Sequence, residues 1–161
     1  MGRVYGFLRI SSGDKFRALL AAALLVAVRF SFVLVSFASC RRVLIGTTAR
    51  LSPIVPGSPP PARVAWAVDA TDRNLPGSRT CLMRSLTSEA IHRLYDHDVV
   101  HQIGVDPIGD ERPDGLEPAG TPNGGFEAHS WIECEGEVIL GDLGDLSRFE
   151  PLPPLNGTER S

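Results

Sequence analysis

The apolar positions in the first third of the chain form one long run. Residues 16–37 are Leu, Ala, Val, Phe and Ser, interrupted only by Arg17 and Arg29. A run of this length forms one or two helices, and it is also long enough to cross a membrane. Insertion of Arg29 would cost about 2.5–3.5 kcal/mol, which the surrounding Leu, Val and Phe residues could offset. The pattern favours helices packed on the rest of the chain. Membrane association through residues 16–37 and a cleaved signal peptide are the alternatives.

Proline separates this helical region from the remainder. Residues 52–63 contain five prolines, which cannot continue a helix, so we expect a linker there. A short helix is expected over residues 64–70, with a turn at residues 74–78. A further helix is expected over residues 81–95, because apolar residues recur there every three or four positions. These residues are Leu82, Leu86, Ala90, Ile91 and Leu94.

Beyond this helix, apolar and polar residues alternate as in strands. We expect three strands, over residues 99–105, 126–133 and 137–140. Glu135-Gly136 predicts a turn between the last two, and residues 106–125 predict a long loop because they are rich in Pro, Gly and acidic residues without a period. Helices followed by neighbouring strands predict an α+β fold, with helices packed on a small antiparallel sheet.

The segments follow from these patterns. We expect an apolar helical region at 1–51, a Pro-rich linker at 52–63, a main domain at 64–150 and an extended tail at 151–161.

The net charge of −3 conceals a marked asymmetry. Residues 1–65 hold nine Lys/Arg and one acidic residue, whereas residues 66–161 hold seven and eighteen. The acidic part would repel phosphates, which argues against nucleic acid as a partner. It suits a basic peptide substrate or a high-salt cytoplasm. The three cysteines are an odd number, which leaves at least one free thiol and favours a reducing compartment, the cytoplasm.

Cys81, His129 and Asp142 are the candidate catalytic residues. A thiol becomes an effective nucleophile beside an imidazole, and a third group orients that imidazole. Cys81 is expected at the first turn of a helix, where N–H groups and the helix dipole stabilise a thiolate. His129 is expected on the same strand face as Trp131, which could wall the site and bind substrate. Asp142 follows a short hairpin that could return it to the histidine, and Asp145 is the alternative third member.

Two other sets of residues could carry chemistry. His92, His97 and His101 are metal-ligand types, but their segment runs from a helix end into a strand, so they would not share a face. Exposed histidines near a helix C-terminus are the simpler interpretation, and we expect no metal site. Cys134 has the wrong strand parity for a nucleophile, and Cys40 is expected in the core.

The motifs around the three candidate residues resemble those of one family. Cys-Leu-x-Arg-Ser-Leu begins at Cys81, Ile-Gly-Val occupies residues 103–105, Phe-x-Ala-His-x-Trp-Ile-Glu spans 126–133, and Gly-Asp ends at Asp142. Over residues 64–150 the chain resembles the transglutaminase-like leader peptidase of lasso peptide biosynthesis. The resemblance implies a transglutaminase-like, papain-like cysteine protease fold with Cys81, His129 and Asp142 as catalytic triad and no cofactor. Ser130 and the long loop depart from the pattern.

The same resemblance implies removal of the leader from a ribosomally made lasso peptide precursor before macrolactam ring closure. The implied partners are the precursor peptide, a leader-recognition protein and an ATP-dependent lasso cyclase. Because 161 residues leave no room for a leader-recognition domain beside the N-terminal helices, we expect that protein to be a separate chain. An amine acceptor in place of water would make the chain a transglutaminase-like acyl transferase. A non-catalytic, membrane-tethered scaffold of a peptide maturation complex is the other alternative.

Overall fold

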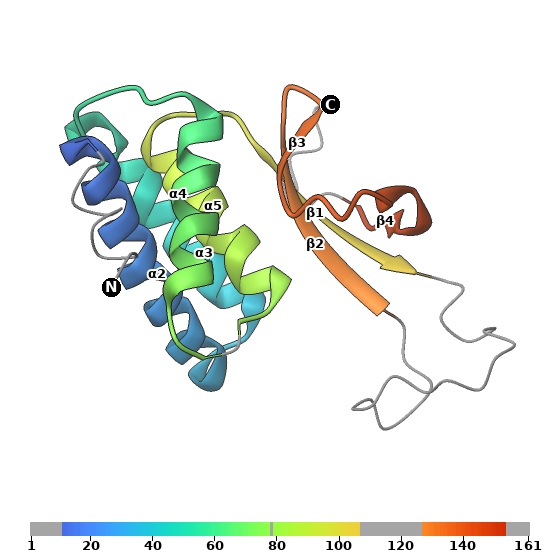
Figure 1. Ribbon diagram of the computed structural model, residues 1–161. Coiled ribbons are helices and arrows are strands. Elements are labelled where there is room, and N and C mark those ends of the chain that lie inside the picture. The colour runs from blue at the N-terminus through green and yellow to red at the C-terminus, as the bar shows by residue number, and fades with distance from the viewer. Residues whose placement is uncertain (1–10, 78, 107–126, 154–161) are drawn as a thin grey trace, which may run out of the picture.

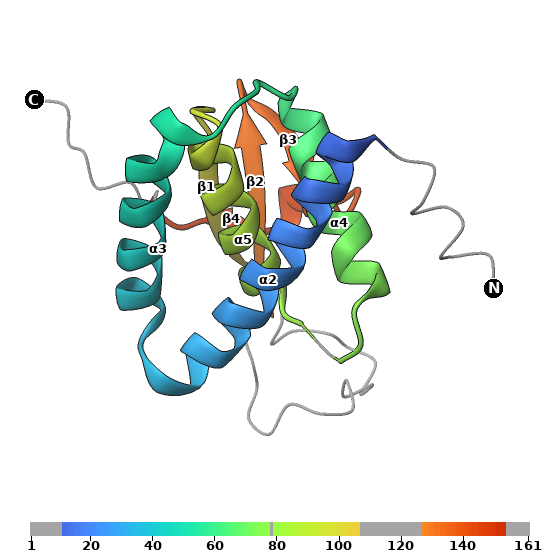
Figure 2. The ribbon, with the colours of Figure 1, turned by 90° about the vertical axis from the view of Figure 1, so that its left-hand side faces the viewer.

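The helices lie on one side of the molecule and the sheet on the other. The structure is a computed structural model that describes residues 11–77, 79–106 and 127–153. In these residues four α-helices precede a four-stranded antiparallel sheet, and the helices cover one face of it (Figures 1 and 2). The expected α+β fold is therefore confirmed. Residues 107–125 of the expected loop lie outside the described part of the chain.

The long apolar run folds as two helices, α2 (Ser12–Leu34) and α3 (Phe37–Leu51). They are separated at residues 35–36, where the backbone is extended and the Ser36 hydroxyl caps the start of α3. The inner face of α2 packs against α4 and α5, as expected for a helix that belongs to the domain. The apolar residues buried there are Ala21, Leu25 and Val28.

The outer face of α2 is also apolar. Phe16, Leu19, Phe30 and Val33 are all more than half exposed. Among the described residues α2 is the one helix long and apolar enough to cross a membrane, although core helices and signal sequences share these properties. Its inner face is part of the core, so α2 could enter a membrane only if that packing were lost.

An ion cluster joins α2 to α4 (Pro61–Asn74). The buried carboxylate of Asp14 contacts Arg17 at 2.6 Å and Arg63 at 2.8 Å. The hydrogen bond from Arg17 is the main reason that the pKa of Asp14 lies below its ordinary value. Helix α4 begins at Pro61, inside the expected linker, because proline suits the first position of a helix, where its missing N–H has no intrahelical acceptor.

Helix α5 (Cys81–Leu94) lies between the other helices and the sheet. It begins where the Thr80 hydroxyl accepts a hydrogen bond from the backbone N–H of Met83 at 3.3 Å, a typical N-cap. Its Ile91 joins Val64 of α4 in the central core. The expected helix over residues 81–95 is thus confirmed to within one residue.

The sheet has the strand order β3-β2-β1-β4. Its strands are β1 (Val100–Asp106), β2 (Glu127–Cys134), β3 (Glu137–Leu140) and β4 (Glu150–Pro151). The three expected strands are confirmed within a residue or two at each end. The turn between β2 and β3 is also confirmed: Glu135 and Gly136 both have positive φ angles, 53° and 84°, which match the twist of a tight hairpin.

Candidate active site

Cys81 occupies the first residue of α5, where it is partly exposed. Its Sγ lies 4.0 Å from the carbonyl oxygen of Ala128, the residue before His129 in β2. The start of a helix presents backbone N–H groups and the positive end of the helix dipole, and both favour a nearby negative charge. The thiol therefore lies beside the strand that carries the histidine, at a position suited to a thiolate and to an oxyanion.

His129 lies on the face of β2 that is turned away from the helices. The side chain of its neighbour Ser130 points toward the helices, because its hydroxyl lies 2.7 Å from His101, which bonds to Glu89 of α5, and successive side chains of a strand point to opposite faces. The His129 ring lies against Trp131, with centroids 6.2 Å apart and planes 14° apart, and its centroid is 5.5 Å from that of Phe149. The imidazole therefore lies close to two aromatic side chains, and the one expected from the shared strand face is Trp131.

Gly104 makes this aromatic packing possible. It is the register partner of His129 on β1, and a Cβ atom there would lie 2.8 Å from Phe149 and 2.9 Å from Trp131. Any side chain would therefore displace the rings that hold the imidazole. On the outer side, the Arg148 guanidinium lies 4.6 Å from the centre of the Phe149 ring and pairs with Glu127 at 3.0 Å.

The hydrogen bond made by His129 determines which of its nitrogens can act as a base. Its Nε2 lies 2.7 Å from the carbonyl oxygen of Gly141. A carbonyl oxygen can only accept, so Nε2 carries the hydrogen, and in the neutral ring Nδ1 is the acceptor. Nδ1 is thus the atom available to take a proton from a thiol.

Gly141 is a site residue that the sequence analysis missed. Its φ is +88°, and a Cβ atom would lie 2.9 Å from the Ser130 oxygen. Only glycine fits this position without strain. The glycine directly after a predicted strand was the available signal, but a bond from a backbone carbonyl has no side-chain signature.

The backbone groups that contact Cys81 and His129 lie along one edge of β2. The carbonyl oxygens of Ala128 and Ser130 point to the same edge, because alternate residues of a strand share a direction. The first contacts Cys81, and the second lies next to Gly141, which binds the His129 ring. Among the described residues no hydrogen bond joins Sγ to the imidazole, so this structure does not contain a thiolate–imidazolium pair.

Asp142 does not contact His129 in this structure, contrary to the expectation that its carboxylate orients the ring. Asp142 is exposed, and its Oδ1 accepts a hydrogen bond from the backbone N–H of Gly144 at 2.8 Å. Asp145, the alternative, accepts from the Ser147 hydroxyl at 3.0 Å. The hydrogen bond that the carboxylate was expected to make with His129 is made by a backbone group, because Nε2 donates to the Gly141 carbonyl. The carboxylate of Asp142 instead holds the turn that follows this carbonyl.

Trp131 is 3% exposed, so it offers a substrate very little surface. Its indole N–H donates to Glu133 at 2.7 Å, and its ring lies nearly parallel to the imidazole. Both contacts are within the protein. The geometry favours a role in holding His129 over the substrate contact expected from the sequence.

The remaining thiols and histidines lie elsewhere. Cys134 donates to the Asp98 carbonyl at 3.7 Å, and burial is the first cause of its raised pKa, while Cys40 is in the core. The expectation of exposed histidines is wrong for His92 and His101, which are at most 1% exposed. Both rings make hydrogen bonds inside the protein, since histidine polar atoms removed from water need partners.

Comparison with known families agrees with this architecture. The core-domain model of the transglutaminase-like superfamily matches residues 24–153, which include the C-terminal part of α2 from residue 24, all of α3 to α5 and the sheet. No curated protein and no solved structure gives a match. The family match covers Cys81, His129 and Asp142 together and extends through the N-terminal helices, so the chain belongs to the transglutaminase-like superfamily.

Proposed function

We propose that this protein is a cysteine protease that removes the leader from a ribosomally made lasso peptide precursor before the macrolactam ring closes. The observation that supports it most is the placement of the Cys81 sulfur beside β2 while His129 is held with Nδ1 as its acceptor nitrogen. This arrangement supplies a nucleophile at a helix start and a base with a fixed tautomer. The motifs at residues 81–86 and 126–133 favour the leader peptidases within the superfamily.

The reaction uses this geometry in two stages. In the first, His129 Nδ1 takes the proton of Cys81 and the sulfur bonds to the carbonyl carbon at the leader–core junction. The C–N bond then breaks as the imidazolium returns the proton to the departing core amine, which leaves a thioester between the leader and Cys81. In the second, a water molecule gives a proton to Nδ1 and attacks the thioester. The leader leaves with a free carboxylate and the thiol is restored.

Asp142 supports the imidazolium electrostatically in this proposal. The Gly141 carbonyl already fixes the tautomer, so the carboxylate of the next residue acts on the reaction through its charge alone. The released core amine becomes the substrate of an ATP-dependent lasso cyclase. A separate leader-recognition protein presents the precursor, in the cytoplasm or at a membrane that α2 contacts.

Mass spectrometry of a lasso precursor incubated with the full chain and its leader-recognition protein tests this function. We expect one cut at the leader–core junction, which Cys81→Ala abolishes. Cys134→Ala is the matched control, because that thiol is also partly exposed but lies against Asp98, and it should leave cleavage unchanged. A product joined to an added amine would show acyl transfer instead. An uncut precursor would favour the scaffold alternative.

A further inference from the structure

Helix α5 contacts the sheet through one polar residue in each of its first three turns, the first two at β2 and the third at β1. Cys81, Ser85 and Glu89 are spaced by four residues, so they lie along one face of the helix. The Cys81 sulfur lies near the Ala128 carbonyl, and the Ser85 hydroxyl donates to the Ser130 carbonyl at 2.9 Å. These two carbonyls belong to the residues on either side of His129. The backbone of His129 is thus attached to the helix that carries the thiol.

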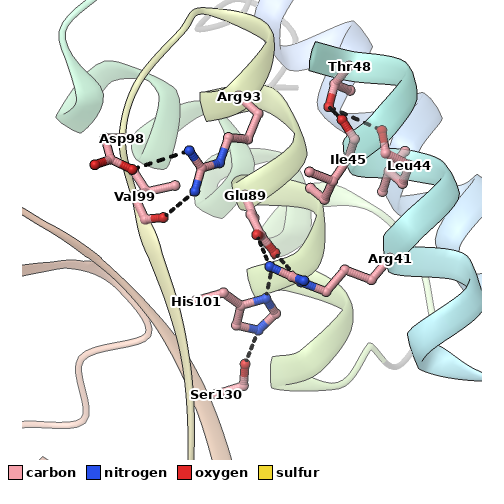
Figure 3. A network of polar contacts seen from close by, with 10 residues as sticks. All are labelled: Arg41, Leu44, Ile45, Thr48, Glu89, Arg93, Asp98, Val99, His101 and Ser130. Carbon is pink, nitrogen blue, oxygen red and sulfur yellow. Dashed lines mark hydrogen bonds and ion pairs between the residues drawn. The ribbon is translucent and has the colours of Figure 1, made fainter. Parts of the chain in front are cut away.

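The third contact extends into a chain of four side chains from four elements. Arg41 of α3 binds the Glu89 carboxylate with two nitrogens, at 2.5 and 3.0 Å. The other neighbour of Glu89 is His101 of β1, whose Nδ1 donates at 2.9 Å, and His101 Nε2 lies 2.7 Å from the Ser130 hydroxyl. Figure 3 shows these residues aligned from α3 across α5 to the sheet. We call Arg41, Glu89, His101 and Ser130 the buried network.

The buried network is sealed from solvent. Glu89, His101 and Ser130 are 0%, 1% and 2% exposed. Serine, histidine and glutamate are bonded here in the order of a serine hydrolase triad, but no substrate can reach a hydroxyl that is this deeply buried. Burial opposes the ionisation of Glu89, yet the hydrogen bonds from His101 and Arg41 outweigh it and hold the pKa of Glu89 below its ordinary value. A buried charge of this kind holds its partners in one arrangement, because an unpaired carboxylate there would be costly.

We propose that the buried network consists of positioning residues that set the location of His129 relative to Cys81; this inference rests on the proposed function. Glu89 lies on the same rigid helix as Cys81, and Ser130 directly follows His129. Ser130 is held at two points, its carbonyl by Ser85 and its hydroxyl by His101. Loss of the hydroxyl contact lets β2 shift relative to α5, and a small shift matters because reaction rates depend steeply on the distance between reacting atoms.

The network also makes α3 a part of the active site's support. Of the four residues in the buried network, Arg41 is the one that lies outside α5 and the sheet. Phe37, one turn earlier on α3, packs edge-on against the His101 ring, with the ring centroids 6.1 Å apart. The N-terminal helices therefore contribute to the geometry of the reaction although they lie far from Cys81 in sequence.

The test compares Ser130→Ala with Asp14→Asn. Asp14 is also a buried, ion-paired residue that joins two elements, but its cluster links α2 to α4, away from Cys81 and His129. With full-length protein, precursor and leader-recognition partner, we expect Ser130→Ala to lower kcat about tenfold with KM unchanged within about twofold. Asp14→Asn should lower the melting temperature but leave kcat within about twofold.

A second readout needs no substrate. The rate at which iodoacetamide alkylates Cys81 at pH 6.5, mapped by peptide mass spectrometry, reports how well His129 assists the thiol. We expect Ser130→Ala to slow it about tenfold and Asp14→Asn to leave it unchanged. If the wild type cleaves no precursor but alkylation still separates the two variants, the proposed protease function fails while the positioning role stands. Equal effects of both variants on kcat and alkylation would overturn the positioning role.

Arg41→Lys serves if Ser130→Ala does not fold. Arg41 is at the solvent end of the network, with 15% of its side chain exposed, and lysine keeps the charge without the two-nitrogen contact. A lowered kcat and slower alkylation at unchanged KM would support the role of the network. Values equal to those of the wild type would overturn it.

Discussion

The ring of Trp131 lies nearly parallel to the ring of His129, with an angle of 14° between the planes. The two residues are two positions apart on β2, so their side chains share one face of the strand. The ring of Phe149 also lies close to the His129 ring. The buried tryptophan thus limits how far the imidazole can rotate, and this relationship separates a positioning role from a substrate-binding one.

Trp131→Phe should keep most of this stack and lose only the hydrogen bond to Glu133, so we expect kcat and KM close to the wild-type values. Trp131→Ala removes a large buried ring and should cost about 3–5 kcal/mol of unfolding free energy, with a large fall in kcat. Steady-state kinetics and urea unfolding measure both. A raised KM in Trp131→Phe with unchanged kcat would instead indicate direct contact with the substrate.

Gly141→Ala should destabilise the protein and reduce activity together. Its positive φ costs about 1 kcal/mol for a residue with a side chain, and the new Cβ would press on the Ser130 oxygen and shift the carbonyl that binds His129. Gly144→Ala is the matched control, because its φ is also positive, 75°, but a Cβ there meets open space. We expect chemical denaturation to show a larger loss for Gly141→Ala, and cleavage to fall only in that variant. Equal losses would show that the contact with Ser130 is unimportant.

Asp142→Asn separates the two roles available to this residue. Asparagine keeps an oxygen that accepts the Gly144 N–H, so the turn should survive and the melting temperature should stay near that of the wild type. The substitution removes the negative charge that follows the carbonyl bound to the ring, and because this carboxylate is exposed and makes no hydrogen bond to His129, we expect kcat to fall by no more than about tenfold. This loss of kcat is smaller than in triads whose aspartate alone fixes the histidine tautomer, because in this protein the Gly141 carbonyl fixes it. Wild-type kcat would restrict Asp142 to the turn.

The lowered pKa of Glu89 predicts a stability change in acid. A carboxyl group whose folded pKa is depressed contributes its full stability above the unfolded value, about 4.3, and loses it as the pH falls through the folded value. The unfolding free energy should therefore drop as the pH falls below about 4.3, and less steeply in Glu89→Gln than in the wild type. Asp14, whose pKa is also lowered, accounts for part of the remaining slope. Urea titrations at several pH values measure it, and identical slopes in the two proteins would contradict the assignment.

The elements were predictable where a local pattern decides them. The apolar spacing after Cys81 and the alternation in residues 126–133 fix α5 and β2, because helix and strand bury their side chains with different periods. The start of α4 was misplaced because proline is excluded from helix interiors but favoured at the first position.

The support of the site could not be predicted in the same way. Every residue has a backbone carbonyl, so the sequence does not indicate that the carbonyl of Gly141 binds His129. Arg41 and Ser130 are far apart in the sequence, and only the tertiary fold brings them into one network. His101, which resembled a metal ligand or a surface residue in the sequence, became a buried link between two elements because of a carboxylate twelve positions earlier, Glu89.

The Arg41–Glu89 pair has a practical consequence for dividing this protein. The proline-rich segment around Pro59 invites a cut that would leave the motif-bearing part as a compact fragment. Such a fragment would lack Arg41 and leave the Glu89 carboxylate without its guanidinium partner, and it would also lose the apolar cover that α2 gives to Val64 and Ile91. The part of the chain that carries the sequence motifs thus depends on α2 and α3, and a variant meant to fold should contain the residues on both sides of the prolines.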